Sequence, residues 1–572
     1  MVSATARTIA PDELTSALKR YWGYEAFRPR QEQIVRSLLD GRDTCVVMPT
    51  GGGKSLCYQL PAALLAERTA IVISPLIALM QDQVAQLALM GIPAAFLNST
   101  LSAGEQAGII KQARGGAYRL LYLSPERLAR QDTLDWLGGI QLSFFAIDEA
   151  HCISEWGHEF RPEYRQMSAL RKHFPQTPIA AFTASATQRV RHDIIEQLQL
   201  REPDKYIASF HRPNLRYLIK LCKAAEQELL LLKALEKYAG QSVIIYASTI
   251  KRVEETVAML KLQGIDALGY HGKMNSEKRN RHQEQWSSDE VPVLVGTNAF
   301  GLGINKAAVR AVIHLALPKS IEQFYQEAGR AGRDGLDSDC VLLWQWRDKQ
   351  ILDYFARNVI DPLERARTEE RNREIVGFAD GWECRHNAIC RHFGESRSWQ
   401  SCGACDFCVG KPEWLRFAID EAFKDEQRQL PLKASRRAKS KTPSSQNALP
   451  TVDRRQAALA NAAALAAAAA NVSPSNARAR LSAAPPSVSG TPANAPVQPR
   501  AALRDHMRQW RREIAKRQSL PAFIVMHDTT LDALCEKQPR TLLELRAVAG
   551  IGERKIELYG QEILDVLARF RD

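Results

Sequence analysis

A glycine-rich segment near the start of the chain has the residues needed to hold the phosphates of a nucleotide. The segment Thr50-Gly51-Gly52-Gly53-Lys54-Ser55 follows an expected strand, 44–48, and begins an expected helix. Glycines let backbone N–H groups close around phosphates, a lysine ammonium can reach the β- and γ-phosphates, and a serine hydroxyl can ligate Mg²⁺. Met48 stands where the full phosphate-loop pattern has its first glycine. The sequence therefore predicts a nucleotide-binding turn, with a purely structural glycine turn as the alternative.

An acidic pair at the end of another expected strand supplies the second part of that chemistry. The strand 144–147 ends in Asp148 and Glu149, and His151 follows two residues later. A carboxylate at a strand end can hold Mg²⁺, and its neighbour can orient or deprotonate the attacking water. We assign the metal to Asp148, together with Ser55, and the water to Glu149. Such a pair means little alone, but behind a phosphate loop it predicts triphosphate hydrolysis.

A third group of candidate catalytic residues lies much further along the chain. Gln326, Arg330 and Arg333 belong to the segment 326–335, and the two arginines, three residues apart, are expected on one face of a helix. An arginine can offset charge on the γ-phosphate in the transition state, an effect of about 10³–10⁵ in rate where it has been measured. The alternative is a solvated basic helix end. If a second lobe completes the site, hydrolysis is coupled to lobe closure, which is what a motor requires.

Eleven cysteines occur in the chain, and three of them have the spacing of metal ligands. Cys402, Cys405 and Cys408 are each separated by two residues, which brings their thiolates to one point for tetrahedral Zn²⁺. A fourth ligand must come from one of four upstream candidates: Cys384, His386, Cys390 and His392. Four protein ligands leave no open coordination position, so we expect a structural zinc. The scattered cysteines are expected to fill the core.

The elements that position these residues alternate between short strands and helices from about residue 10 to 345. The expected strands of a first series are 44–48, 70–74, 120–124, 144–147 and 179–183, and those of a second series are 243–247, 267–270, 293–296, 311–315 and 340–343. A helix is expected over 76–90. This alternation predicts two α/β lobes with parallel sheets, joined near residues 205–225. Further helices are expected around the cysteines and in the last 70 residues.

Composition and charge limit the class of protein and the kind of partner. The net charge is +13, and residues 431–500 contain ten Lys and Arg against one acid. That segment is rich in Ala, Pro, Ser and Arg and contains no aromatic residue, so we expect a disordered linker. A basic chain favours a polyanionic partner, nucleic acid before an anionic membrane. No apolar run is long enough to span a bilayer and the N-terminus lacks a secretory signal, so we expect a cytoplasmic, nucleoid-associated protein without a membrane partner.

The three nucleotide-related motifs, in this order, resemble those of superfamily-two helicases, and their surroundings resemble the RecQ family of DNA helicases. The segment 22–31, Trp-Gly-Tyr-Glu-Ala-Phe-Arg-Pro-Arg-Gln, is similar to the RecQ adenine-recognition motif. The resemblance implies that Tyr24 and Arg28 sandwich the adenine base and that Gln31 bonds to its edge. Bidentate bonding of glutamine to adenine is chemically sensible. For Tyr24 alone, simple core packing is the alternative.

The segment 152–162, Cys-Ile-Ser-Glu-Trp-Gly-His-Glu-Phe-Arg-Pro, gives the most specific match. It is similar to the aromatic-rich loop of RecQ helicases, which senses single-stranded DNA and couples it to hydrolysis. The resemblance implies DNA contacts by four residues: Trp156, His158, Phe160 and Arg161. Aromatic rings beside a cation can stack on bases, worth about 1–3 kcal/mol per base. An aromatic cluster is usually core, but the interleaved charges favour a loop.

The family resemblance also bears on the zinc ligands and on the end of the chain. RecQ zinc modules place the first cysteine nine residues before a Phe-Gly-Glu, and here 393–395 points to Cys384, with Cys390 as a spare thiol. RecQ proteins usually continue with a winged helix, for which we find no room before the linker. The segment 503–570 resembles an HRDC domain. Its turn at 550–555, Gly-Ile-Gly-Glu-Arg-Lys, could meet DNA phosphates, with a purely structural turn equally expected.

The expected organisation has five parts: an ATP-binding RecA-like lobe (1–208), a second RecA-like lobe (209–345), a helical zinc module (346–430), the linker (431–500) and an HRDC-like domain (501–572). The resemblance implies a monomeric, ATP-dependent 3′–5′ helicase in repair and recombination, using ATP, Mg²⁺ and Zn²⁺. The implied partners are single-stranded and branched DNA and a single-stranded-DNA-binding protein. The alternatives are a DNA translocase or annealing scaffold that unwinds little, and an RNA helicase.

Overall fold

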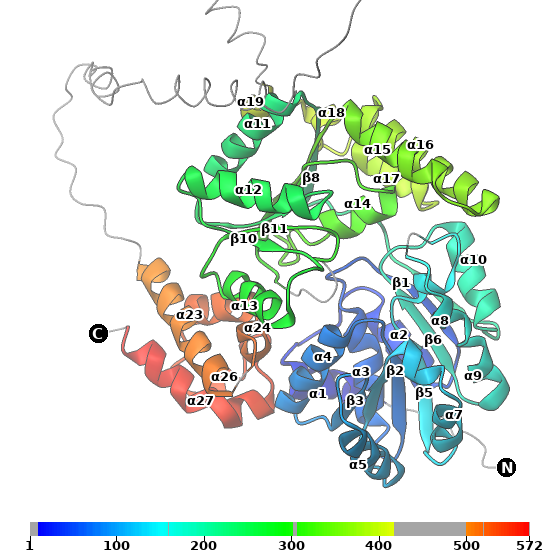
Figure 1. Ribbon diagram of the computed structural model, residues 1–572. Helices are drawn as coiled ribbons and strands as arrows, with labels where there is room; N and C mark the ends of the chain where they lie inside the picture. Colours follow the sequence, from blue (N-terminus) through cyan, green and yellow to red (C-terminus); the bar gives the residue numbers. More distant parts are fainter. Residues whose placement is uncertain are drawn as a thin grey trace, which may run out of the picture. The chain divides into compact units, whose positions relative to one another are not determined.

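The computed structural model describes residues 10–157, 159–300, 306–397, 399–416, 499–518 and 520–570. Two sheets, a helical module with the cysteines and a C-terminal helical domain form these parts (Figure 1). His158 and nearly all of the expected linker, 431–498, lie outside the described residues. No helix within the described ranges is both long and apolar enough to cross a membrane.

The first lobe is built on a seven-stranded parallel sheet with the order β3-β4-β2-β5-β6-β1-β7, drawn in blue to cyan in Figure 1. Its strands are β1 (Thr44–Val47), β2 (Thr69–Ile73), β3 (Ala94–Leu97), β4 (Leu120–Leu123), β5 (Leu142–Ile147), β6 (Ile179–Thr183) and β7 (Asp204–Ile207). The central strands are continuous apolar runs because both faces of a parallel sheet are covered. Val46 and Val47 of β1, for example, belong to two different buried clusters on opposite faces.

The helices of this lobe connect its strands. They are α1 (Pro11–Trp22), α2 (Gln31–Leu39), α3 (Lys54–Leu64), α4 (Ile77–Leu89), α5 (Ala103–Arg114), α6 (Pro125–Leu128), α7 (Gln131–Leu137), the 3₁₀ turn η1 (Ala150–Ile153), α8 (Pro162–Arg165), α9 (Ser168–His173) and α10 (Gln188–Gln197). The helix expected over 76–90 is α4, and Gly91 follows it with a φ of +75°. A left-handed glycine is a common way to end a helix.

The second lobe has a six-stranded parallel sheet with the order β10-β11-β9-β12-β13-β8, drawn in green in Figure 1. Its strands are β8 (Leu215–Leu221), β9 (Ser242–Tyr246), β10 (Ala267–Tyr270), β11 (Val293–Gly296), β12 (Val309–His314) and β13 (Ser338–Trp344). Its helices are α11 (Ala224–Lys237), α12 (Ile250–Leu262), α13 (Ser276–Ser287) and α14 (Ile321–Ala328). The prediction of two parallel-sheet lobes is confirmed.

Three strands were not expected, and two of them overlap the segment 205–225 in which the junction between the lobes was predicted. The segment 205–225 contains most of β7 and all of β8, so only 208–214 connects the two sheets. β3 and β7 are edge strands with short or polar sequences, which lack the continuous apolar run of a central strand. β8 alternates Leu215, Arg216 and Tyr217 at the other sheet's edge, where β13 alone pairs with it.

The remaining helices form the cysteine-containing module and the C-terminal domain. The module contains α15 (Trp346–Arg357), α16 (Pro362–Asp380), α17 (Arg385–His392), α18 (Asp406–Val409) and α19 (Glu413–Arg416). The domain contains α23 (Pro499–Gln518), α24 (Ala522–Val525), α25 (Asp528–Lys537), α26 (Leu542–Leu545) and α27 (Glu553–Ala568), around its own buried cluster. These helices match the helical zinc module and C-terminal helical domain that the sequence predicted.

Candidate active site between the two lobes

The phosphate loop lies between buried strand β1 and helix α3, as the sequence predicted. Gly51 and Gly53 have φ values of +83° and +81°, which side chains rarely adopt. Lys54 begins α3 and donates from Nζ to the carbonyl oxygen of Met48 at 3.1 Å. Met48 itself is buried in the core of the first lobe. The residue that departs from the phosphate-loop pattern therefore packs inward and supplies a carbonyl that holds the lysine.

The acidic pair stands at the end of β5, where backbone and side-chain contacts fix it. The Asp148 N–H donates to Ile73 O at 2.8 Å, and the Tyr164 hydroxyl donates to Asp148 O at 3.0 Å. Glu149 has a φ of +48° and lies 3.3 Å from His151 Nδ1. Burial and the neighbouring Glu149 raise the pKa of Asp148 to about 7, against the opposing effect of Lys54. A carboxylate in such a place gains from a bound cation, so these residues fit Mg²⁺.

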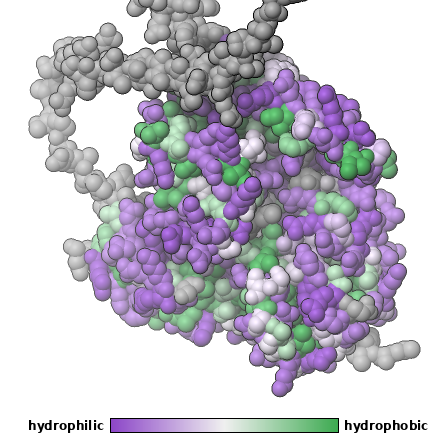
Figure 2. Space-filling model, viewed as in Figure 1, coloured by the Kyte–Doolittle hydropathy of each residue, from purple (hydrophilic) through white to green (hydrophobic). Residues whose placement is uncertain are grey.

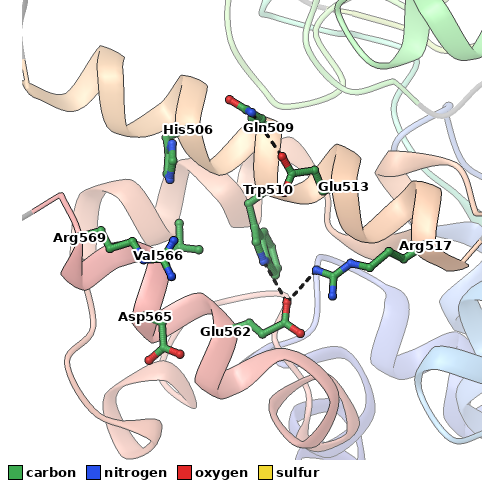
Figure 3. A pocket seen from close by; sticks show the side chains of 9 residues that line it. All are labelled: His506, Gln509, Trp510, Glu513, Arg517, Glu562, Asp565, Val566 and Arg569. Atoms are coloured by element: carbon green, nitrogen blue, oxygen red, sulfur yellow. Dashed lines mark hydrogen bonds and ion pairs between the residues drawn. The ribbon is translucent and has the colours of Figure 1, made fainter.

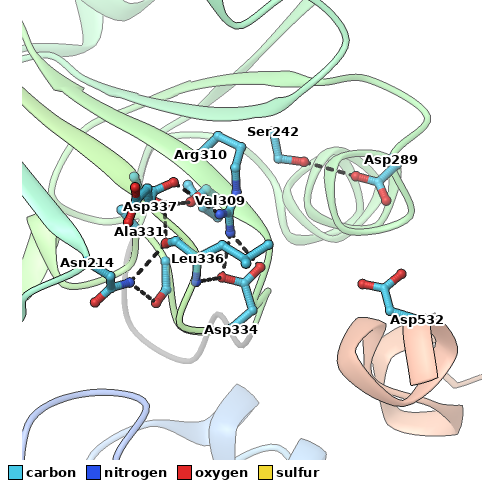
Figure 4. Close-up of polar contacts among 12 residues, drawn as sticks. Asn214, Ser242, Asp289, Val309, Arg310, Ala331, Asp334, Leu336, Asp337 and Asp532 are labelled. Carbon is cyan, nitrogen blue, oxygen red and sulfur yellow. Dashed lines mark hydrogen bonds and ion pairs between the residues drawn. The ribbon is translucent and has the colours of Figure 1, made fainter. Parts of the chain in front are cut away.

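The two candidate arginines lie in a turn, which corrects the prediction that they share a helical face. Helix α14 ends at Ala328, and Arg330 and Arg333 follow it in consecutive turns. The one glycine between them, Gly332, has a φ of +54°, which does not continue a helix. Asp334 anchors the turn through Arg310 at 2.5 Å, as Figure 4 shows.

A second anchor of this turn comes from the connection between the lobes. The side-chain amide of Asn214 donates to Gly332 O at 2.9 Å and to Leu336 O at 3.0 Å (Figure 4). A Cβ added at Gly332 would lie 2.5 Å from the Asn214 amide nitrogen, so only glycine fits. The arginine turn is thus held rigidly by the segment that joins the lobes.

The arginine turn reaches the phosphate loop of the other lobe. The Thr50 hydroxyl donates to Gly329 O at 3.3 Å, and a Cβ added at Gly329 would lie 2.8 Å from that hydroxyl oxygen. A Cβ added at Gly51 would lie 3.5 Å from Arg333 Cγ. Burial, together with the neighbouring Arg330 and Arg212, lowers the pKa of Arg333 to about 9. Clustered cations next to a phosphate loop are suited to an incoming polyphosphate.

A second link between the lobes starts from the third predicted catalytic residue. Gln326 of α14 donates from Nε2 to the Ser185 hydroxyl at 2.9 Å. Ser185 follows β6, whose last residue, Thr183, contacts His151 Nδ1 through its hydroxyl at 2.9 Å. A continuous chain of polar contacts therefore runs from the acidic pair to the second lobe.

Two of the three predicted adenine-binding residues contact the phosphate loop. Arg28 donates to Gly51 O, and the Gln31 amide lies 3.2 Å from both Gly52 O and Gly53 O. Gln31 Oε1 in turn accepts the Arg28 N–H at 2.9 Å. Tyr24 packs half-buried against the core of the first lobe. The structure thus brings Arg28 and Gln31 to the phosphate loop, and Tyr24 to the core of the same lobe.

The aromatic-rich loop follows the acidic pair directly and has one buried part and one open part. Trp156 lies between two arginine guanidinium groups, with Arg189 2.9 Å and Arg367 4.0 Å from the ring centroid. Phe160 is 38% exposed, with Arg165 5.6 Å from its ring. Arg161 bonds through its backbone N–H to Cys152 O at 2.9 Å. The loop therefore presents aromatic and cationic groups together, as binding of single-stranded nucleic acid requires.

Four cysteine sulfurs converge in the helical module. The Sγ atoms of Cys384, Cys402, Cys405 and Cys408 all lie within 4.8 Å of one another. Two backbone N–H groups donate to Cys402 Sγ, both at 3.4 Å. Four thiolates within such a distance, supported by N–H donors, fit a tetrahedral Zn²⁺.

The other candidates for the fourth ligand are engaged elsewhere. Cys390 is buried and outside the cluster, His386 Nε2 contacts Arg212 O at 3.1 Å, and His392 Nε2 pairs with Glu322 at 2.6 Å. Burial lowers the pKa of His386 to about 4. Among the alternatives left open by spacing, the geometry thus favours Cys384.

Comparison with known proteins identifies the family. The chain matches the family models for DEAD/DEAH box helicases (residues 28–194), the helicase conserved C-terminal domain (225–335), RecQ zinc-binding (346–409) and the HRDC domain (500–567). It is 36% identical over 594 residues to the ATP-dependent DNA helicase RecQ of Pasteurella multocida, with 97% of this chain and 93% of that protein covered. The chain belongs to the RecQ family.

Two further relatives carry the same description. The RecQ helicase of Haemophilus influenzae is 41% identical, with 71% of this chain and 65% of that protein covered. That of Bacillus subtilis is 40% identical, with 69% and 66% covered. As a RecQ protein with both helicase domains, the chain is an ATP-hydrolysing helicase. ATP and Mg²⁺ belong to that activity, and the RecQ zinc-binding domain with its four cysteines accounts for Zn²⁺.

One residue of this RecQ site was missed by sequence reasoning. Arg212, in the connection between the lobes, donates to Thr50 O at 3.3 Å and to Gly332 O at 3.0 Å. It therefore joins the phosphate loop to the arginine turn. A single arginine outside any motif gives no signal in one sequence, because its role comes from contacts across more than a hundred residues.

The HRDC domain of this RecQ chain presents its glycine turn to the first lobe. The Gly550 N–H donates to Gly23 O at 3.3 Å, and a Cβ added at Gly23 would lie 2.6 Å from the Ile551 backbone. Arg554 pairs with Glu557 at 2.6 Å, and Lys555 is buried. In this arrangement the turn is a packing element next to the segment that carries the adenine-recognition residues.

A pocket of about 360 Å³ lies within the HRDC domain, between α23 and α27 (Figure 3). Glu562 accepts from Arg517 at 3.1 Å and from the Trp510 indole at 3.4 Å, and both side chains point to it in the figure. Glu513 and Asp565 also line the pocket. Three carboxylates and the guanidinium groups of Arg517 and Arg569 line it, so the pocket lacks the excess of positive charge that binds the phosphates of a nucleic acid.

Proposed function

We propose that this chain is an ATP-dependent 3′–5′ DNA helicase that moves along single-stranded DNA and unwinds duplex or branched DNA in repair and recombination. The observation that carries the proposal is the nucleotide site built from both lobes, in which Thr50 and Gly51 meet Gly329 and Arg333. Binding and hydrolysis of ATP at such a site change the contacts between the lobes. The relatives' description as DNA helicases supports DNA as the track.

Each residue of the site has a chemical task in this proposal. Lys54 and the loop N–H groups bind the phosphates, Ser55 and Asp148 would hold Mg²⁺, and Glu149 orients the attacking water. Arg330 and Arg333 offset the charge that develops on the γ-phosphate. Because these arginines belong to the second lobe, the transition state is stabilised only when the lobes are together.

Single-stranded DNA communicates with hydrolysis through the aromatic-rich loop. Trp156 follows Glu149 by seven residues, and polar contacts through His151, Thr183, Ser185 and Gln326 join Glu149 to the second lobe. A base that displaces an arginine from the Trp156 ring, or that stacks on the exposed Phe160, would shift the loop and with it the acidic pair. We infer that this is how the track stimulates the motor.

The zinc module supports that loop in the proposal. Cys384, Cys402, Cys405 and Cys408 would bind a structural Zn²⁺, which can contribute about 10–16 kcal/mol to folding in small domains. The same module carries Arg367, whose guanidinium lies over Trp156 and bonds to Glu155 at 3.1 Å. We further propose that the chain acts as a monomer in the cytoplasm and meets a single-stranded-DNA-binding protein on its track.

ATPase assays with two tracks test the substrate. We expect a DNA oligonucleotide to stimulate hydrolysis at least about tenfold more than an RNA oligonucleotide of the same sequence, as base stacking with shape selection allows. Glu149→Gln, which keeps the nucleotide contacts but loses the water-orienting carboxylate, serves as the hydrolysis-deficient control. A preference for RNA would overturn the DNA assignment in favour of an RNA helicase.

A further inference from the structure

The hairpin of α15 and α16 carries large apolar side chains that the fold leaves in solvent. Tyr354 and Phe355 on α15 are 64% and 62% exposed, Ile360 in the connection is 93% exposed, and Leu363 at the start of α16 is 69% exposed. We call these four residues the hairpin tip. Figure 2 shows apolar surface, in green, over α15 and α16. Contiguous exposed apolar side chains of this size generally mark a binding surface.

The hairpin does not need these side chains for its own packing. The buried apolar residues of α15 are Leu352 and Ala356, neither of which belongs to the tip, and Ile375 and Phe378 are buried at the other end of α16. The Tyr354 and Phe355 rings contact each other, with centroids 5.8 Å apart in an edge-to-face arrangement. Two aromatic rings are thus held together on a rigid helix and face solvent.

The hairpin tip lies next to the aromatic-rich loop. Arg367 of α16 contacts Trp156 and Glu155, and Leu363 precedes Arg367 by four residues. Residues four apart share one face of a helix and are separated by about one turn, roughly 6 Å along its axis. The face of α16 that contacts the proposed DNA-sensing loop therefore continues directly into the apolar tip.

The charges around the tip are mixed and include one exposed cation. Arg357 is exposed at the end of α15. Asp353 pairs with Lys349 at 2.7 Å and Glu364 pairs with Arg371 at 2.5 Å, whereas Asp361 is exposed and caps α16 by accepting the Leu363 N–H at 3.0 Å. An available cation beside aromatic and aliphatic side chains can hold a phosphate while the apolar groups contact bases.

We propose that the hairpin tip is a strand-separating wedge, which stacks on the terminal base pair at the junction between duplex and single-stranded DNA. One strand passes to Trp156 and Phe160, and the tip blocks the other. Apolar side chains inserted at a base step unstack it, which is the physical task of a wedge. This inference rests on the proposed DNA track, and it supplies a separating element in a chain whose sequence shows no room for a winged helix.

The first experiment separates unwinding from movement. Tyr354→Ala/Phe355→Ala and Ile360→Ser/Leu363→Ser are compared with the unaltered chain, and Leu262→Ala/Trp382→Ala is the matched control at 87% and 91% exposed positions elsewhere. We expect strand displacement per ATP hydrolysed to fall at least about tenfold in both tip variants, as lost stacking on a base predicts. ATPase stimulated by single-stranded DNA should stay within about twofold, since the tip is outside the site described for it. Tyr354→Phe should retain displacement.

The second experiment reads the junction directly. A forked DNA with 2-aminopurine in its first base pair is bound with a non-hydrolysable ATP analogue, and its fluorescence change is compared between the unaltered chain, the control and the tip variants. We expect the fluorescence change to be present with the unaltered chain and the control variant, and absent with the tip variants.

Equal displacement and equal fluorescence in the tip variants and the control would overturn the wedge and would indicate that the tip binds a protein partner instead. A parallel loss of ATPase would also overturn it, because the tip would then serve the motor itself. If the unaltered chain hydrolyses ATP on DNA but displaces no strand, the result contradicts the proposed unwinding function itself, and not only the wedge.

Discussion

The aromatic-rich loop and the glycine turn of the HRDC domain look alike as sequences but differ in the structure. Both combine glycine with arginine or lysine, and for both the sequence suggests contact with DNA, with a purely structural turn equally expected for the HRDC segment. In the loop, Phe160 is 38% exposed and Trp156 lies between two arginines. In the turn, Gly550 bonds to Gly23 and Lys555 is buried. The first segment offers its groups to a ligand, whereas the second uses them for packing.

This difference shows what makes such a segment either a DNA-binding loop or a packing element. Glycines permit a close approach of any partner, whether a phosphate or a helix end, and a lysine binds phosphate only if its ammonium is exposed. Burial lowers the pKa of Lys555 to about 8, so its ammonium is still charged at pH 7 but is buried away from any phosphate. The loop therefore belongs to the DNA path that we propose, and the turn joins the HRDC domain to the first lobe.

The largest expected effect comes from stopping hydrolysis while leaving the loop intact. Lys54→Ala removes the ammonium that binds the phosphates, so ATP turnover should fall at least about 100-fold. Single-stranded DNA binding should change less than about threefold, because the loop contacts DNA independently of that ammonium. Turnover by malachite-green assay and binding by fluorescence anisotropy check both. Normal turnover in this variant would contradict the assignment of the nucleotide site.

A smaller effect is expected when the loop loses its central ring. Trp156→Ala should lower DNA affinity and DNA-stimulated ATPase about tenfold, in line with the loss of one base stack. Basal hydrolysis should stay within about twofold. Trp382→Ala, at a 91% exposed position, is the matched control. If the ATPase of Trp156→Ala were still fully stimulated by DNA, the aromatic-rich loop would not be the element that senses DNA. It would then not differ from the HRDC turn in this respect.

The smallest expected effect concerns the buried lysine of the turn. Its pKa lies near 8 in the folded state and at 10.5 in a free side chain, so the buried charge costs stability in full below pH 8 and the cost disappears toward pH 10.5. Lys555→Met should therefore stabilise the HRDC domain by about 1–3 kcal/mol at pH 7, with the gain shrinking as the pH rises from 8 to 10.5. DNA affinity should not change.

Local opening of that domain can be followed through Cys535, a buried cysteine of its core. The ratio of alkylation rates of Cys535 between variant and unaltered chain, read by mass spectrometry at each pH, reports the change in opening free energy. Lys516→Met, at an exposed lysine of α23, is the control. A large loss of DNA affinity in Lys555→Met would instead return the turn to the DNA path.

Much of the fold could be predicted because its central strands are continuous apolar runs between helices. The edge strands of the first sheet could not be predicted. Asp204–Ile207 is polar and Ala94–Leu97 is short, and neither has a hydrophobic pattern typical of a strand. These strands form because a neighbour in the sheet offers free backbone groups to pair with. Pairing of that kind depends on tertiary structure and leaves little trace in the local sequence.

The candidate site also has a part that could be predicted from the sequence and a part that could not. The local motifs around Lys54 and Asp148 were recognisable because each lies within a few residues on one strand–helix connection. The packing between lobes was not: Arg330 and Arg333 were expected on a helix, but glycines place them in a turn. Arg212 had no signal, because its partners lie more than a hundred residues away. Contacts across the lobes decide how the site is completed.

In the function that we propose, hydrolysis between the lobes drives separation of DNA strands, and strand displacement on forked duplexes measures this coupling. The unaltered chain and Lys54→Ala are incubated with ATP and either a 3′-tailed or a 5′-tailed fork. We expect the unaltered chain, and not Lys54→Ala, to displace the strand of the 3′-tailed fork, with little displacement on the 5′-tailed fork. Brisk DNA-stimulated ATPase without displacement of either fork would contradict it and identify the chain as a translocase or scaffold.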